Sequence, residues 1–377
     1  MITWEKLQTT SRWLPGYLLQ RAVRSVPSKR PLHLMISLVD HFEPAINPEN
    51  PRIYVPRHVQ LRRLEDWLRL YPKAVDSLRD SDGFPFRHTY FYPAEQYDPE
   101  QIEMLAHFCH EGWGDVEIHL HHGVDSPDTS ENTRRVLEEF RDALVHHGCL
   151  SRLHGSNLPR YAFVHGNWTL ANSGKGFCGV DDEMQILAET GCYADFTLPS
   201  APNPAQTAKI NSIYECSLPL NQRAPHRRGY DLKVGRTPKT LPIIIQGPLG
   251  LAYRKRPGGK RCFTIENSEL AGSNPPSIDR LHSWIRAGVR VQGRPDWVFI
   301  KLHCHGMDPR DEEAVLGPPL RRFLQDLYDV SRKGELRTHF VTAREMANIA
   351  FAACDGREGD PGRYRNYLFT LMNSPKQ

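Results

Sequence analysis

The sequence predicts an α/β protein whose mostly parallel β-sheet closes into a distorted (β/α) barrel. Short apolar runs alternate with helical segments along most of the 377 residues, as in parallel α/β folds. The apolar runs are nearly continuous, which is typical of strands buried on both faces. Polar clusters follow several of these runs directly. Ligands that converge from the ends of many successive strands favour the rim of a barrel over an open sheet.

The first elements follow from local patterns. Residues 32–39, LHLMISLV, are almost entirely apolar and are predicted to form a buried strand. Leucines and a tryptophan at helical spacing predict a helix at 56–80. The segment 88–93 is rich in aromatic residues and ends at proline, which indicates a strand. Asp98 and Pro99 are typical of a helix start, and that helix is expected to end at Gly112.

The alternation continues to the end of the chain. The next strand leads into the segment EIHLHHGVD at residues 117–125. The other predicted helices are 130–147, 181–190, 277–287, 311–332 and 342–353, and the other predicted strands are 161–164, 193–198, 241–245, 297–302 and 337–341. We expect the barrel to span 31–353, between an N-terminal segment (1–30) and a C-terminal tail (354–377). Residues 203–275, rich in Pro, Gly, Arg and Lys, are expected to form an irregular insertion or cap, with a hairpin around Gly258-Gly259.

Composition narrows the class of protein. A formal net charge of +4, spread along the chain, does not favour a nucleic-acid partner. No run of about 18 apolar residues predicts a membrane span, and no export signal is recognised, so we expect a cytoplasmic protein. The eight cysteines form no Cys-x-x-Cys pair and are expected to be buried thiols in a reducing compartment. No glycine-rich phosphate loop supports a nucleotide cofactor.

Residues 4–26 have a basic amphipathic pattern. We expect a helix that packs on the domain, interrupted near Pro15 and Gly16. The alternative is peripheral contact with a membrane surface through the same residues.

The segment 117–125 holds three histidines and two carboxylates in nine residues. On a strand, His119 and His121 share one face and His122 points away. Imidazoles and carboxylates that meet at a strand end are the usual material of a zinc-type site. A second such stretch, Leu302-His303-Cys304-His305-Gly306, follows another apolar run, and His303 and His305 again share a face.

The order of these motifs resembles that of the NodB-homology polysaccharide deacetylases, carbohydrate esterase family 4, over roughly residues 32–350. The carrying motifs are VDHFEP (39–44), EIHLH (117–121) with Asp125 four residues on, and IKLH (300–303). The family's Arg-x-Pro-Tyr motif is absent, and VHGNW (164–168) stands in its place. The resemblance implies a distorted (β/α) barrel that removes acetyl groups from sugars with the help of a divalent metal.

The resemblance also implies residue roles. Asp40 matches the catalytic base and His303 the general acid. His41, His121 and Asp125 take the places of the metal ligands, and zinc is the expected ion. His119 competes with Asp125 as a ligand or donates a hydrogen bond to one of the ligands. His305 competes with His303 as the acid and is, like His119, a possible ligand or a partner of one. Glu43 and Glu117 are expected to orient histidines, and His165, Asn167 and Trp168 to line a carbohydrate-binding cleft.

Three alternatives stay open at this point. A histidine-rich barrel could hydrolyse phosphoesters with more than one metal. A related barrel could hydrolyse glycosidic bonds, with Glu43 and Asp195 as the carboxylate pair. The chain could also be a catalytically inactive glycan-binding homologue. The sequence leaves the sugar and the oligomeric state open.

Overall fold

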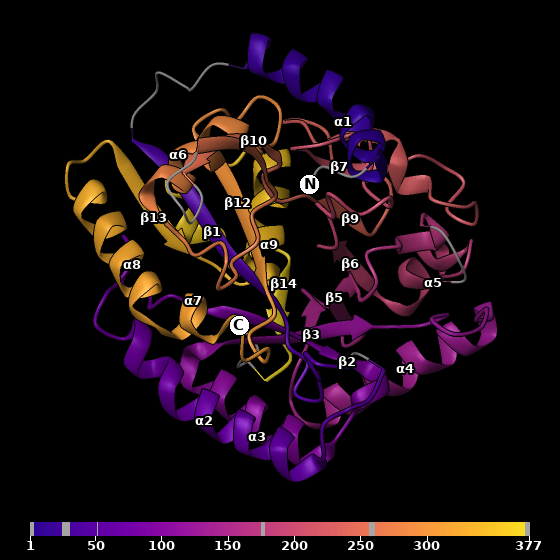
Figure 1. The fold of residues 1–377 in the computed structure, drawn as a ribbon. Coiled ribbons are helices and arrows are strands. Elements are labelled where there is room, and N and C mark those ends of the chain that lie inside the picture. Colours follow the sequence, from indigo (N-terminus) through magenta and orange to yellow (C-terminus); the bar gives the residue numbers. More distant parts are fainter. Residues whose placement is uncertain (1–3, 25–30, 51, 175–177, 256–260, 374–377) are drawn as a thin grey trace.

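The computed structural model describes residues 4–24, 31–50, 52–174, 178–255 and 261–373. They form an α/β fold in which strands and helices alternate around a large, mostly parallel sheet (Figure 1). The predicted α/β class is therefore confirmed. The finer prediction, a closed barrel, remains a prediction.

The elements agree closely with the alternation seen in the sequence. The strands are β1 (Leu32–His41), β2 (His88–Pro93), β3 (Gly114–Leu120), β4 (Ser151–Leu153), β5 (Pro159–His165), β6 (Cys192–Asp195), β7 (Ile213–Cys216), β8 (Gly229–Asp231), β9 (Ile243–Ile245), β10 (Gly250–Lys255), β11 (Arg261–Glu266), β12 (Trp297–Cys304), β13 (Leu336–Phe340) and β14 (Phe369–Leu371). The α-helices are α1 (Trp4–Val23), α2 (Arg57–Val75), α3 (Pro99–Phe108), α4 (Ser130–His146), α5 (Glu183–Thr190), α6 (Ile278–Ala287), α7 (Glu312–Leu316), α8 (Pro318–Ser331) and α9 (Ala343–Cys354).

Three expectations need correction. The helix predicted at 311–332 is two helices, because Gly317 ends α7 and prolines begin α8. The helix that begins at Pro99 ends at Phe108 and gives way to a π-turn before Gly114. The segment 203–275 is less irregular than expected, since it contains β7 to β11. The tip of the predicted hairpin between β10 and β11 lies outside the described residues.

The sheet has the strand order β12-β1-β2-β3-β5-β6-β9-β7-β8. Its strands from β12 to β9 are parallel, and β7 and β8 add an antiparallel edge. Strand β13 pairs with the first half of β1, on the side where β2 pairs with the second half. The parallel strands therefore bring their carboxyl ends to one edge of the sheet, where the predicted site residues lie.

Alternate residues of the strands enter two separate cores. On the outer face, Leu38 and Leu302 pack with side chains of the surrounding helices, such as Leu64 and Tyr71 of α2. Figure 1 shows α2, α3, α4 and α8 around the outside of the strands. This alternation decides on which face each polar residue at a strand end lies.

The inner face packs on a single helix. Val39 and Phe299 of the sheet share a core with Met346, Ala347 and Ala350 of α9. Every residue of α9 is buried, and the helix lies among the strands in the centre of Figure 1. Thr342 and Glu345 begin this helix with a capping box. The inner face is thus filled below the strand ends.

Helix α1 packs on the insertion, as the preferred interpretation of residues 4–26 predicted, but the expected interruption near Pro15 and Gly16 is wrong, because the helix runs from Trp4 to Val23 with Pro15 inside it. Trp13 is fully buried against Ala201, Ile210 and Leu249. The opposite side of α1 exposes Leu18, Leu19 and Val23, and contact with a membrane surface remains a prediction. All eight cysteines lie in the described ranges and are free thiols. No helix of the described ranges is both long and apolar enough to cross a membrane.

Candidate metal centre

Four polar side chains meet on the inner face at the carboxyl ends of β1 and β3. His41 ends β1, His119 lies near the end of β3, and Glu43 and His121 follow the two strands. We call these four residues the histidine cluster. Ligand atoms of His41, Glu43 and His119 all lie within 4.8 Å of one another. His121 extends the group, because its Nε2 lies 3.7 Å from Glu43 Oε1.

The rings of His119 and His121 are oriented by hydrogen bonds at Nδ1. Nδ1 of His119 lies 3.0 Å from the Val164 carbonyl oxygen, and Nδ1 of His121 lies 2.7 Å from Glu95 Oε1. Both Nδ1 atoms therefore act as donors, and both Nε2 atoms face Glu43 Oε1, 3.3 Å from His119 and 3.7 Å from His121. A histidine that donates from one ring nitrogen while the other faces a shared point is typical of metal ligands.

His41 completes the cluster with unused nitrogen atoms. Its side chain is fully buried, and neither ring nitrogen has a hydrogen-bond partner among the described residues. The ring centroid lies 4.8 Å from those of His119 and His305 and 4.7 Å from that of Trp168. Buried polar atoms are rarely left unpaired. The unpaired nitrogens of His41 therefore indicate that a ligand belongs in the cluster.

The electrostatics of the cluster follow from burial and proximity. Burial opposes the charge of Glu43, but the hydrogen bond from His119 and the charge of His121 outweigh it and lower the Glu43 pKa to about 2. Burial likewise opposes protonation of His121, but Glu95 and Glu43 outweigh it and raise the His121 pKa to about 9. Burial and the neighbouring His119 and His305 hold the pKa of His41 well below its usual range. Glu43 is thus ionised and His41 neutral, the states that a metal requires, whereas a bound metal would have to displace a proton from His121.

The donor set fits a divalent ion such as zinc. Imidazole nitrogens with one carboxylate oxygen are common zinc ligands, and catalytic zinc sites leave one position open. Glu43 and the two oriented histidines would supply three ligands, and His41 the fourth or a contact with the bound substrate. The buried His/Glu group could thus hold a metal ion.

Trp168 and two further histidines border the cluster. Trp168 lies against His41 and His303, with ring centroids 4.7 Å and 5.2 Å apart. Its backbone has a φ of 65°, a conformation that L residues rarely adopt. Such strain is concentrated at functional sites. His303 is buried with Nδ1 unpaired among the described residues, and His305 is partly exposed beside His41.

The structure does not bring Asp40 to this cluster. Asp40 and His41 are neighbours on β1, so their side chains leave opposite faces of the sheet. The Asp40 carboxylate is buried on the outer face, where Oδ1 accepts a hydrogen bond from the Gly306 amide at 2.7 Å. Its Oδ2 lies 3.6 Å from His88 Nε2. This placement corrects the expectation that Asp40 acts as a base beside the metal.

Asp125 and Glu117 also lie elsewhere. Asp125 is exposed in the loop after β3 and belongs to none of the metal-type groups found among the described residues. Glu117 lies deeper on the inner face and accepts hydrogen bonds from the Tyr193 hydroxyl at 2.5 Å and the Ala162 amide at 2.6 Å. Burial raises the Glu117 pKa to about 8 despite these bonds. Of the rivals for one ligand position, His119 therefore lies in the cluster and Asp125 does not.

The residues predicted to line a cleft, His165, Asn167 and Trp168, do not all lie beside the histidine cluster. His165 and His122 lie on the outer face beside Glu183, as expected for His122. Nδ1 of His165 accepts a hydrogen bond from the Asn167 amide, which holds the turn before Trp168. Of the three predicted cleft residues His165, Asn167 and Trp168, Trp168 contacts the histidine cluster directly. His165 affects the cluster only by holding the backbone turn that leads to Trp168.

Two residues of the site were missed from the sequence. Glu95 follows β2 in a short 3₁₀ turn and orients His121. Lys301 is fully buried on β12, donates to the Leu198 carbonyl at 3.3 Å, and helps to hold the pKa of His303 well below its usual range. Lys301 is the single charged residue of an apolar strand and lies two residues before His303. By strand alternation, those two side chains share a face.

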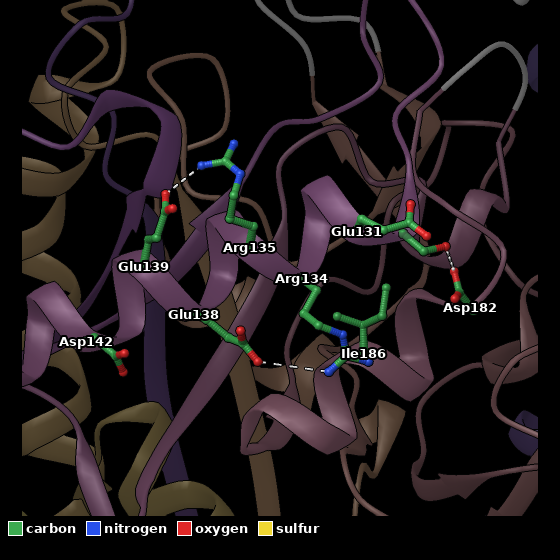
Figure 2. A pocket seen from close by; sticks show the side chains of 9 residues that line it. Glu131, Arg134, Arg135, Glu138, Glu139, Asp142, Asp182 and Ile186 are labelled. Atoms are coloured by element: carbon green, nitrogen blue, oxygen red, sulfur yellow. Dashed lines mark hydrogen bonds and ion pairs between the residues drawn. The ribbon is translucent and has the colours of Figure 1, made fainter.

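A surface hollow between α4 and α5 lies apart from this chemistry. Its lining is mostly charged, and Figure 2 shows Arg135 joined to Glu139 and Arg134 joined to Glu138 along α4. Exposed ion pairs of this kind stabilise a helix by less than about 1 kcal/mol and indicate no ligand. The histidine cluster is the stronger functional candidate.

Comparison with known proteins adds no family assignment. A scan against protein-family models finds no match for this chain, and a search of the curated proteins finds no relative. The likeness to polysaccharide deacetylases therefore rests on the motifs quoted above.

Proposed function

We propose that the protein is a metal-dependent hydrolase that removes an acetyl group from a sugar or glycan intermediate. The observation that carries the proposal is the convergence of His119 Nε2 and His121 Nε2 on Glu43 Oε1, 3.3 Å and 3.7 Å away. Histidines held at Nδ1 by protein acceptors are prepared to bind an ion at Nε2. The acetylated sugar is the substrate class that the motif resemblance implies.

The residues around the cluster supply the other requirements. When bound, the ion would act as a Lewis acid that polarises the acetyl carbonyl and makes water a stronger nucleophile near neutral pH. Burial, together with the charges of Lys301 and His305, holds the His303 pKa well below its usual range, so His303 is neutral. Its unpaired Nδ1 can accept a proton from the attacking water and return it to the leaving nitrogen or oxygen. In this proposal, His303 acts both as the base, the role expected of Asp40, and as the acid.

Trp168 gives the site one wall. Its indole lies against His41 and His303, so a sugar ring that reaches these histidines would stack on an aromatic face. The partly exposed His305 stands beside His41, 4.8 Å between ring centroids, and could contact the same substrate.

The alternatives receive less support. A glycosidase needs a free carboxylate nucleophile. Glu43 is held by His119 and His121, and Asp195 is fully buried with the Thr197 hydroxyl as its donor. A phosphoesterase with several metals would need a second set of ligands beside the histidine cluster, and His303 and His305 belong to no metal-type group among the described residues. The Asp40 group lies on the opposite face.

Metal analysis and acetate release test the proposal together. Purified protein should contain zinc or bind it when added, and should release acetate from N- or O-acetylated saccharides. His119→Ala and His121→Ala should each lower zinc affinity by at least about 100-fold and abolish acetate release. His146→Ala, an exposed histidine at the end of α4, is the matched control and should change neither. Unchanged zinc binding in both cluster variants would disprove the assignment, and bound zinc without acetate release would favour the inactive homologue.

A further inference from the structure

We propose that Asp40, His88 and Cys304 form a second metal-ion site, on the outer face of the sheet beneath α2, for a thiophilic divalent cation such as zinc. The three residues lie on the neighbouring strands β1, β2 and β12. Asp40 and Cys304 are register partners, and all three ligand atoms lie within 4.8 Å of one another. We call these residues the outer triad.

The polar atoms of the outer triad are poorly satisfied. All three side chains are fully buried. Within the described part of the chain, neither nitrogen of His88 has a hydrogen-bond partner, and Asp40 Oδ2 has none apart from the weak thiol donor of Cys304. Leaving a buried polar group without a partner costs about 1–3 kcal/mol. A bound cation would satisfy these atoms together.

The charged side chains near Asp40 would also favour a bound cation. The charged side chains that act on the Asp40 carboxylate, Glu43 and Asp311, are both negative. An ionised carboxylate in this position is stable when a positive charge is close. A Cys304 thiolate and an Asp40 carboxylate would together balance a divalent ion, with His88 neutral.

The donor atoms and their spacing suit zinc. Sulfur, imidazole nitrogen and carboxylate oxygen are its usual ligands, at bond lengths that place tetrahedral neighbours about 3.3–3.8 Å apart. Asp40 Oδ2 and His88 Nε2 are 3.6 Å apart before any ion is bound. Three protein ligands leave a fourth position for water or another small ligand.

A hollow in the protein surface lies close to the outer triad. A hollow over α2 is lined by Arg63, Asp66, Trp67, Leu70, Gly306 and Met307, among others. Gly306 separates this hollow from Asp40. A Cβ at Gly306 would collide with Asp40 Oδ2 and would lie 2.7 Å from Trp67 Cη2. Gly306 therefore lines the hollow and also lies in close contact with Asp40.

Two other groups of histidines and carboxylates differ from the outer triad because each contains a histidine that is held by a hydrogen bond at Nδ1. Nδ1 of His165 accepts the Asn167 amide, so Nε2 carries its proton and offers no lone pair to an ion. Nδ1 of His339 is held by Asp82 at 2.8 Å, and its Nε2 faces His33 Nδ1 at 2.9 Å. His165 Nε2 itself has no hydrogen-bond partner among the described residues and lies 3.8 Å from Glu183 Oε2. His88 differs because it has no such partner at either ring nitrogen.

The outer triad and the histidine cluster share no residue, so the two assignments are independent. Strand alternation sends His41 and His303 inward and Asp40 and Cys304 outward from the same pair of strands. Each ion can be bound without the other, and sulfur distinguishes the two sites, because the histidine cluster contains no cysteine.

Metal substitution tests the inference. Protein loaded with Co²⁺ or Cd²⁺ should show the near-ultraviolet charge-transfer band of a metal–thiolate bond. Cys304→Ser should remove the band and lower the metal content by one ion per chain, and His88→Gln should weaken binding of that ion by at least about 100-fold. Cys354→Ser, a buried free cysteine on α9, should leave band and content unchanged. His119→Ala should lose the other ion and keep the band.

The outcomes separate the two proposals. Wild-type protein without the band, or a band that survives in Cys304→Ser, overturns the outer triad, and the first result needs no variant to fold. A band with one ion per chain that His119→Ala does not remove supports the outer triad and contradicts the histidine cluster.

Discussion

Gly166 makes room for the ring of His121. A Cβ on Gly166 would lie 2.5 Å from Cγ of that ring, far inside van der Waals contact. The backbone of Gly166 is fixed in this place, since its amide donates to the Leu120 carbonyl at 2.8 Å. The loop after β5 and the histidine that follows β3 therefore pack closely because Gly166 has no side chain.

Gly166→Ala should displace His121 and weaken metal binding. The added methyl group must push the ring off its Nδ1 bond to Glu95, and loss of such an orienting contact lowers metal affinity by about 10–100-fold. Competition with a zinc chelator measures the effect. Gly16→Ala in α1, where the new Cβ meets its nearest neighbour at 3.4 Å, is the matched control. Equal affinities in the two variants would contradict the packing described here.

Replacing Trp168 should separate substrate binding from metal binding. Trp168→Ala removes the aromatic wall but no donor atom of the histidine cluster. We expect unchanged zinc content and a KM for an acetylated saccharide raised by about tenfold or more, the loss of roughly 1.4 kcal/mol of stacking. Loss of zinc in this variant would show that Trp168 supports the cluster rather than the substrate.

The outer-face histidine His122 should make stability depend on pH. Burial opposes its charge, but Glu183 and Asp128 outweigh burial and raise its pKa to about 9, above the unfolded value near 6.5. Its contribution is therefore fully present below pH 6.5 and is lost as pH rises through 9. His122→Gln should reduce the free energy of unfolding by about 2 kcal/mol at pH 6 and much less at pH 10.

Urea unfolding of metal-free protein at both pH values measures this difference. His146→Gln, exposed at the end of α4, serves as the control and should show no such pH dependence. An equal loss at pH 6 and pH 10 would mean that His122 is not charged in the folded protein.

The buried pair Arg280 and Glu266 should be a weak point when one partner is removed. Arg280 donates to both carboxylate oxygens at 2.9 Å and 3.1 Å, and Trp284 donates to the same carboxylate. Arg280→Met should lower the free energy of unfolding by about 3–5 kcal/mol, because the buried carboxylate loses its guanidinium. Adding Glu266→Leu should recover part of the loss. Thermal unfolding of both variants tests this, and a single variant as stable as the wild type would contradict it.

The same pair should also affect His303. The segment beyond Glu266 flanks β12, where the His303 amide donates to the Ser268 carbonyl and the Leu270 amide donates to the His303 carbonyl. Under conditions in which it stays folded, Arg280→Met should therefore lower acetate release while zinc content stays constant.

The elements were predictable because their signals are local. Asp98 and Pro99 mark the start of α3, and the Asp98 side chain does accept the amides of Glu100 and Gln101. The grouping of His119 with His121 follows from strand period alone. The same two-residue period on β1 places Asp40 and His41 on opposite faces of the sheet. The motif resemblance, in contrast, assigns both residues to one site. Glu95 could not be predicted, because its approach to His121 depends on how a turn packs between strands.

The position of α9 means that the inner core can form only late in the synthesis of the chain. Strand β13 and α9 leave the ribosome after every strand from β1 to β12, yet β13 pairs with β1 and α9 fills the inner face. The apolar inner face of the nascent sheet therefore stays uncovered until more than nine-tenths of the 377 residues have been made. During that interval the growing chain presents a surface that chaperones recognise, and a ribosome stalled before α9 would carry a sheet without its inner core.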